Sequence, residues 1–157
     1  MKFLTIIFLF LSVFYFSQEI DCPVENGVTY YNESYEFITK RDCWNIYRGS
    51  YQSPSTKIHS EKPISVISVS EGKIVAIICT GNLLTTLVRK RNNEFYVYGN
   101  LTLVNFTKGD EVKIGDKIGE INIKDEFSDY GDYVLDFQYW QKTEPIDVFD
   151  QLKCIKK

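Results

Sequence analysis

The chain contains a single histidine, His59, and this residue limits the hydrolytic chemistry that the sequence supports. Imidazole is the side chain that most often moves protons near neutral pH, and it is a common ligand of zinc. A metal centre built from several histidines is therefore excluded. A serine triad or a cysteine–histidine dyad would have to use His59, and the G-x-S-x-G pattern that presents a nucleophilic serine is absent.

Carboxylates gather before and on the last apolar segment of the chain. Two carboxylates at a fixed separation across a cleft would suit glycoside hydrolysis, but a sequence does not show that separation. Weak calcium binding stays open as an alternative, although the ligand spacing of a known calcium loop is missing. We favour a solvated acidic loop for this cluster, which comprises Asp125, Glu126, Asp129, Asp132 and Asp136.

Four cysteines, none of them in a C-x-x-C pair, allow two disulfides in an oxidising compartment and three connectivities. We expect Cys22–Cys43, which would tie down the N-terminal segment, and Cys79–Cys154, which would attach the C-terminus to a core strand. Metal binding by the cysteines is the alternative, and their wide spacing lacks the paired knuckles of a structural zinc site.

The N-terminus has the pattern of a secretory signal peptide. Lys2 precedes an apolar run, Phe3–Phe16, and Ser17 supplies a small residue at its exit. The run is short for a permanent bilayer span, and an uncleaved anchor is the alternative. We predict a signal peptide at residues 1–17, a secreted or periplasmic location, and no permanent membrane span after cleavage.

The charge of the chain argues against nucleic acid as a partner. With 18 Lys and Arg against 21 Asp and Glu, the formal net charge is −3, which does not provide the basic surface that phosphate binding requires. The short basic run Arg89–Arg91 stands beside Asn92 and Asn93. We interpret this run as the solvated end of a hairpin.

Short apolar segments separated by glycine and asparagine turns predict an all-β fold, a small single-domain barrel or sandwich of antiparallel strands. Residues 18–55 form an aromatic-rich N-terminal extension that includes Tyr30 and Trp44; its rings are expected to pack on the main domain, with sugar stacking as the alternative. The expected strands are Ile64–Val69, Lys73–Cys79 (largely buried), Leu83–Lys90, Glu94–Tyr98, Glu111–Ile114, Lys117–Ile121 and Asp132–Trp140.

Five landmarks occur in an order that resembles the lysostaphin/LytM-type peptidoglycan endopeptidase domain, a zinc metallopeptidase of the barrel-sandwich hybrid type with a duplicated hybrid motif. They are Val66–Ile74, Tyr98–Leu101, Val104–Ile121, Val134–Gln138 and the residues after Pro145. The resemblance covers about Ser53 to Leu152. Biotinyl and lipoyl carrier domains share the Gly-Asp phrase, but they need a modifiable lysine that is usually next to a methionine, and Met1 is the only methionine.

The resemblance implies a peptidase-like β-barrel domain at residues 56–152, followed by a C-terminal tail at 153–157. Its zinc ligands and catalytic histidines would fall at Ser53, Lys57, Asn100, Val134 and Asp136 of this sequence. Only Asp136 keeps a metal-capable group, so the resemblance implies a degenerate site without catalytic residues or bound metal.

His59 lies two residues after Lys57, so a strand would place both on one side. With Asp136 it is the candidate for a makeshift metal or proton-transfer site. We favour a surface or loop histidine without a special role.

We therefore expect a non-catalytic, peptidase-like module that has no cofactor and binds or regulates peptidoglycan or a cell-envelope protein. Its remnant cleft would be lined by Tyr98, Asn100, Asp136 and Gln138. One alternative is a zinc-dependent peptidoglycan endopeptidase with an atypical site made of His59, Asp136 and the acidic loop. Another is a structural secreted protein. The sequence does not name the ligand, the partner or the oligomeric state.

Overall fold

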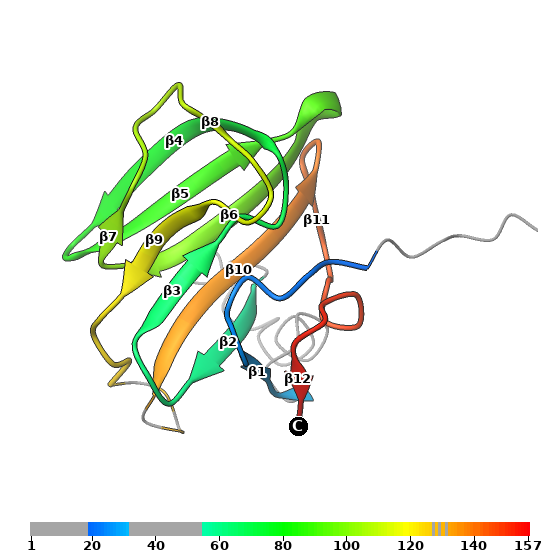
Figure 1. Cartoon of the computed structure of the whole chain (residues 1–157). Coiled ribbons are helices and arrows are strands. Elements are labelled where there is room, and N and C mark those ends of the chain that lie inside the picture. The colour runs from blue at the N-terminus through cyan, green and yellow to red at the C-terminus, as the bar shows by residue number, and fades with distance from the viewer. Residues whose placement is uncertain (1–18, 32–54, 127, 129, 131) are drawn as a thin grey trace, which may run out of the picture.

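The structure is a computed structural model that describes residues 19–31, 55–126, 128, 130 and 132–157. These residues form two β-sheets packed face to face (Figure 1). The elements are β1 (Val28–Thr29), β2 (Thr56–Ser60), β3 (Ile64–Ile67), β4 (Gly72–Thr80), β5 (Leu83–Arg89), the 3-10 turn η3 (Arg91–Asn93), β6 (Glu94–Leu101), β7 (Leu103–Val104), β8 (Glu111–Val112), β9 (Lys117–Ile121), β10 (Tyr133–Gln141), β11 (Glu144–Ile146) and β12 (Ile155–Lys156).

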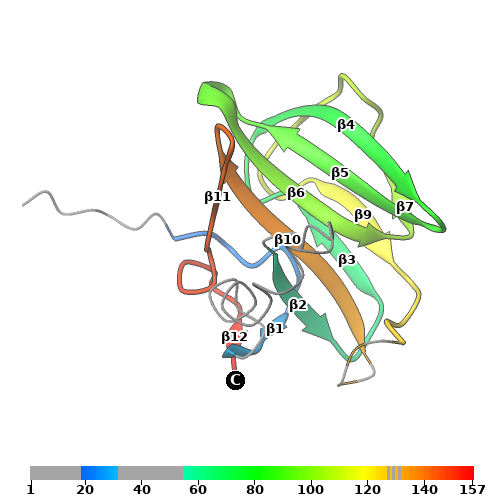
Figure 2. The ribbon, with the colours of Figure 1, turned by 180° about the vertical axis from the view of Figure 1, so that it is seen from behind.

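The large sheet has the order β12-β1-β2-β10-β6-β5-β4-β8, with β11 added to β10, and the small sheet has the order β3-β9-β7. Every strand pair is antiparallel except β1 with β12. The small sheet covers one face of the large sheet (Figure 1), and Figure 2 turns the opposite face to the viewer. The predicted all-β fold is confirmed as an open sandwich rather than a closed barrel.

The hairpin predicted around Asn92 and Asn93 is confirmed as β5-η3-β6. Both asparagines have positive φ angles, 71° and 58°, a conformation that asparagine tolerates better than other side chains with a Cβ. The prediction that β4 is largely buried is wrong. Ile74 is fully buried, but Ile78 is 50% exposed and Cys79 is exposed, because the outer half of β4 lies at the rim of the sheet.

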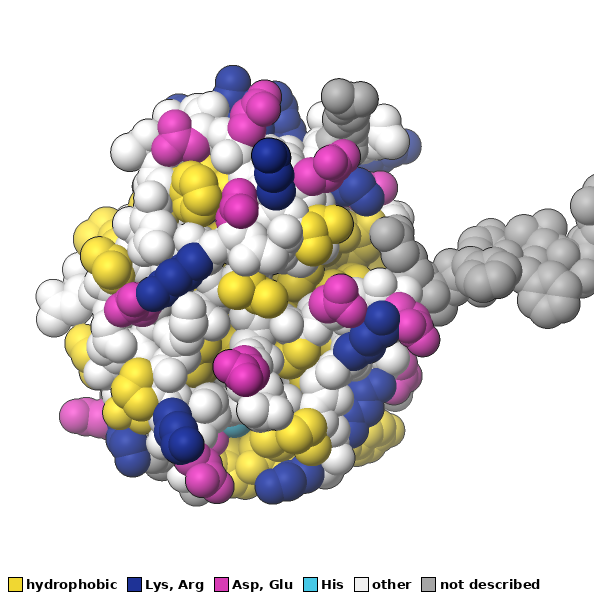
Figure 3. Space-filling view, in the orientation of Figure 1, with side chains coloured by type: hydrophobic (Ala, Val, Ile, Leu, Met, Phe, Trp, Pro, Cys, Tyr) yellow, Lys and Arg dark blue, Asp and Glu magenta, His cyan; other side chains and the backbone are white. Residues whose placement is uncertain are grey.

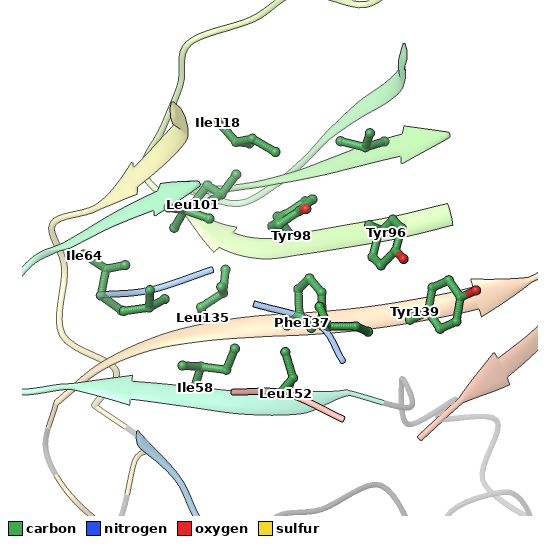
Figure 4. Packing of buried hydrophobic residues seen from close by; sticks show 14 of the residues in the cluster. Ile58, Ile64, Tyr96, Tyr98, Leu101, Ile118, Leu135, Phe137, Tyr139 and Leu152 are labelled. Carbon is green, nitrogen blue, oxygen red and sulfur yellow. The ribbon is translucent and has the colours of Figure 1, made fainter. Parts of the chain in front are cut away.

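The core fills the space between the two sheets. Figure 4 shows Tyr98, Leu101, Leu135 and Phe137 of the large sheet pointing toward Ile64 and Ile118 of the small sheet. Period-2 alternation on β10 explains this face, because every second side chain of a strand points the same way. The rings of Tyr98 and Phe137 meet edge to face with centroids 5.4 Å apart, a favoured aromatic geometry.

The N- and C-terminal segments of the described chain lie side by side. Val28 and Thr29 pair with Ile155 and Lys156, and Ile20 forms a bridge with Leu152. A disulfide joins these segments. It links Cys22 to Cys154, whose Cα atoms are 5.0 Å apart, a separation that suits a disulfide.

Both predicted disulfides are therefore wrong. Cys154 bonds Cys22, so neither Cys22–Cys43 nor Cys79–Cys154 forms, and Cys79 carries a free, exposed thiol. The physical reason is the parallel pairing of β1 with β12, which brings together two cysteines 132 residues apart. Cys43 lies outside the described residues.

The predicted signal peptide also lies outside the described residues. Within the described part of the chain, no helix has the length and apolar character needed to cross a bilayer. On the face shown in Figure 3, basic and acidic side chains alternate, and no large patch of one sign is visible.

Candidate functional site

The candidate site lies on the face of the large sheet that points away from the small sheet, which we call the outer face. Along β10, Leu135 and Phe137 enter the core, so Val134, Asp136 and Gln138 belong to the outer face. Asp136 lies opposite Lys57 of β2 and opposite Gly99 of β6. A Cβ at residue 99 would lie 3.1 Å from the Cβ of Asp136, so glycine leaves the space that this carboxyl occupies.

Three side chains of β10 form a chain of hydrogen bonds along the outer face, which we call the polar ladder: Trp140, Gln138 and Asp136. Trp140 Nε1 donates to Gln138 Oε1 at 2.9 Å, and Gln138 Nε2 donates to Asp136 Oδ1 at 3.3 Å. The ladder therefore ends on a carboxyl group at the centre of the sheet.

Burial is the main influence on Asp136 and raises the pKa of its carboxyl. Hydrogen bonds from Gln138 and Ser55, and the positive charge of Lys57, lower this pKa in part. Loss of solvent disfavours a carboxylate unless a cation or donors replace the water. Asp136 is therefore a carboxyl whose charge depends on its immediate neighbours.

One hollow opens on the outer face next to Asp136, and a second opens beside Asn100 and Val134. One has a volume of about 500 Å³, with an apolar floor and the polar ladder at its side; it is lined by Ile78, Thr85, Leu87, Phe95, Val97, Asp136, Gln138, Trp140 and Lys142. The other has a volume of about 390 Å³ and is lined by Leu83, Asn100, Ile121, Ile123, Lys124, Asp125, Glu126 and Val134. An apolar floor with a few convergent polar groups is the usual composition of a ligand site.

Of the four predicted cleft residues, the structure brings three to these hollows. Asp136 and Gln138 line the larger one, and Asn100 lines the smaller one. The placement of Tyr98 in a cleft is wrong, since its side chain is fully buried in the core, where its hydroxyl accepts a hydrogen bond from the Val69 amide at 3.1 Å. Burial raises the pKa of Tyr98 to about 12.

Asn100 reaches the smaller hollow through an unusual backbone conformation. Its φ angle is +63°, which interrupts the regular alternation of β6 just before Leu101 returns to the core. Its Nδ2 donates to the carbonyl oxygen of Val134 at 3.3 Å. Asparagine is one of the few residues other than glycine that adopts this conformation at modest cost.

His59 is not the surface or loop histidine that we favoured. It lies in β2 with 1% of its surface exposed, and its Nδ1 is 3.0 Å from Oδ1 of Asp132. The ring of His59 meets the rings of Tyr30 and Tyr130 edge to face, and those two tyrosines stack at 3.8 Å. Ser128 also donates to Asp132, at 2.9 Å.

Sequence reasoning missed this cluster because its members come from three separate segments. Asp132, rather than Asp136, is the carboxylate that the structure pairs with His59. The acidic residues near the C-terminus do not form one site either, since Asp125 and Glu126 line a hollow while Asp132 is buried. Among the described residues, no three His, Cys, Asp or Glu side chains gather in a way that suits a metal ion.

Comparison with known proteins gives a likeness in fold. No family model matches the sequence, and no curated protein matches it. The SpoIIQ chain of the SpoIIQ–SpoIIIAH pore forming complex matches with a TM-score of 0.62 and 18% identity, over 87% of this chain and 92% of that chain.

Two peptidases match over a smaller part. A zinc containing peptidase from Vibrio cholerae has a TM-score of 0.51 and 19% identity, over 59% of this chain and 28% of its own. Lysostaphin has a TM-score of 0.50 and 22% identity, over 59% of this chain and 40% of its own. The described domain thus has the fold of the lysostaphin/LytM-type peptidase domain, as the landmarks predicted, and spans less than half of either peptidase.

The side chains at the expected zinc position do not fit a zinc ion. The register of β2 and β10 places Lys57 directly opposite Asp136, which agrees with the positions carried over from the resembled family. An ammonium group repels a cation, and Val134 offers no donor atom. The amide nitrogen of Asn100 points to a backbone carbonyl. Ser53 lies outside the described residues.

Proposed function

We propose that this domain is a non-catalytic binding module that holds a cell-envelope component, peptidoglycan or a cell-wall enzyme, on its outer face. The observation that carries the proposal is the pairing of Lys57 with Asp136 at the position where the fold would hold zinc, beside a hollow of about 500 Å³. A lysine opposite the carboxyl disfavours a metal cation there and leaves the hollow as a binding surface.

The lining of the larger hollow supports binding of an amphipathic ligand. Phe95 and Trp140 line it with rings that suit sugar or side-chain packing, and Thr85 and Lys142 add polar side chains. The SpoIIQ chain, which shares the fold, assembles with a protein, SpoIIIAH. That assembly supports a binding role for the same fold here. Export by the N-terminal signal peptide would bring the domain to the cell envelope.

Retention on purified peptidoglycan sacculi tests the proposal. We expect the protein to sediment with sacculi and Trp140→Ala to weaken retention by about tenfold, since one aromatic contact contributes about 1 kcal/mol beyond its buried area. Tyr31→Ala is the matched control, because Tyr31 is exposed and lines neither hollow. If sacculi do not retain the protein and purified cell-wall hydrolases do not bind it, the proposal fails.

A cleavage assay separates this proposal from an atypical peptidase. The protein is incubated with muropeptides and zinc, and the products are followed by mass spectrometry. We expect no cleaved cross-bridges. Cleavage that disappears in Asp136→Asn, a variant that keeps the shape of the site, would replace the binding module with an enzyme.

A further inference from the structure

The outer edge of β4 is open along most of its length. β8 pairs with Gly72 and Lys73, and Ile74 exchanges backbone hydrogen bonds with Asp110 and Gly109, at 2.9 and 2.8 Å. From Val75 to Thr80, no described residue pairs with this edge, while β5 occupies the inner edge throughout. A row of unpaired backbone groups is a template for another strand.

Of the features that keep sheet edges apart, this open edge has a β-bulge, where the register with β5 shifts between Ile74 and Ala76, but neither charges nor prolines. From Ile74 to Thr80 the strand has no charged residue and no proline. Ile78 is half exposed, and Cys79 is exposed with a free thiol. Long, apolar edges are rare in proteins that remain monomeric, because charges, prolines or covering loops usually protect them.

The other edges among the described strands have such protection or, like that of the two-residue β7 (Leu103–Val104), are very short. β11 contains Pro145 and Glu144, and the two-residue strands β8 and β12 contain Glu111 and Lys156. The outer edge of β3 is covered by the N-terminal segment, since Val24 forms a bridge with Val66 and the Ile67 amide donates to the Pro23 carbonyl. The open part of β4 is thus longer and less protected than the other edges among the described strands.

We propose that the β4 edge pairs with the β4 edge of a second copy of this chain and joins the two large sheets into one. Such a pair is antiparallel and self-complementary, so it closes as a twofold dimer instead of growing into a fibre. The occupant is a second copy because the partner strand must be extended, uncharged and free on one side, and among the described strands β4 itself meets these conditions. Two neutral strands meet without like-charge repulsion.

Cys79 and Thr80 provide variants that leave the outer-face hollows intact, since neither residue lines them. Cys79→Ser removes the thiol and keeps the edge neutral, so a dimer that persists in this variant is not a disulfide. Cys79→Lys and Thr80→Lys each place a charge on the edge. Ile155→Lys is the matched control, because Ile155 is 49% exposed, lines neither hollow and lies in β12, which the sheet order separates from β4 by five strands.

Sedimentation velocity over about 10 µM to 1 mM, the range of weak interfaces, tests the proposal. We expect a concentration-dependent dimer in the wild type, in Cys79→Ser and in Ile155→Lys. Both edge-lysine variants should raise the dissociation constant at least about tenfold, since the symmetry of the dimer introduces each charge twice. Backbone amides of residues 75–80 should exchange more slowly in the dimer than in the monomer.

A protein that stays monomeric at about 1 mM would overturn the proposal. A dimer that survives both edge-lysine variants, that Ile155→Lys disrupts, or that leaves the exchange of residues 75–80 unchanged would also overturn it. The edge and the larger hollow share Ile78, but Cys79 and Thr80 line neither hollow, so the edge-lysine variants test the dimer without changing a side chain that lines the proposed ligand surface.

Discussion

Two carboxyl groups near the start of β10, Asp132 and Asp136, each have a basic partner on β2, and their surroundings differ. Asp132 accepts from the buried His59 beneath two stacked tyrosines. Asp136 lies opposite Lys57 at the edge of a hollow, at the end of the polar ladder. The first pair joins distant segments of the fold, whereas the second lies beside the hollow that we propose as a binding surface. Two carboxyl groups four residues apart thus differ through their neighbours.

The largest expected effect comes from the first pair. Asp132→Ala leaves the buried imidazole of His59 without its carboxylate, and an unpaired buried polar group costs about 2–3 kcal/mol. We expect the free energy of unfolding to fall by that amount in urea titrations followed by tryptophan fluorescence. Glu126→Ala, which removes an acidic residue from the same loop region, is the control. An equal loss in both variants would contradict a special role for the His59–Asp132 pair.

A smaller loss should follow removal of the ring that covers the pair. Tyr130→Ala ends the stacking with Tyr30 and the edge contact with His59. Because aromatic pairs contribute about 0.5–1.5 kcal/mol beyond their burial, we expect destabilisation of about 1 kcal/mol. Tyr130→Phe should behave like the wild type in the same titration, and a loss in this variant would indicate that the hydroxyl rather than the ring stabilises the cluster.

In the second pair, removal of the carboxyl charge should stabilise the protein near neutral pH instead of destabilising it. Burial raises the pKa of Asp136 above its usual 3.8, so the folded protein binds a proton that the unfolded chain releases as the pH rises. The contribution of this group to the free energy of unfolding is therefore largest below about pH 4. It is lost as the pH rises through the raised pKa. Asp136→Asn should remove this fall and be at least as stable as the wild type near pH 7. A destabilised Asn variant at pH 7 would contradict the assignment.

The smallest effect concerns the charge beside Asp136. Lys57 lowers the pKa of this carboxyl, so Lys57→Met should raise it further. Carboxyl carbon chemical shifts followed by NMR through a pH titration measure the change directly. Lys62→Met, an exposed lysine in the turn after β2, is the control and should leave the Asp136 titration unchanged. An unshifted Asp136 in Lys57→Met would show that its hydrogen bonds alone counter the burial.

Local patterns in the sequence predict most of the fold. The strand expected at Asp132–Trp140 matches β10, and the two asparagines marked the tip of the β5-β6 hairpin, because pleat and turn chemistry act over a few residues. The landmarks also predicted the positions of Lys57 and Asp136, which the structure places opposite each other.

The failures have non-local causes. The Cys22–Cys154 bond depends on the pairing of β1 with β12, and spacing along the chain does not report such a contact. The apolar composition of β4 suggested burial, but its outer half has no sheet above it. His59 is buried by rings from Tyr30 and Tyr130, 29 residues before it and 71 residues after it.

The disulfide between Cys22 and Cys154 also determines how the domain responds to a mechanical force applied at its two ends. A force applied at residues 19 and 157 reaches the disulfide after a few residues at each end. The tension then passes through this covalent bond, and the 131 residues between the cysteines bear none of it. Reduction would transfer the same pull to the short β1-β12 ladder, which has two residue pairs. The domain would then begin to open from the ends of its chain while the sandwich was still intact.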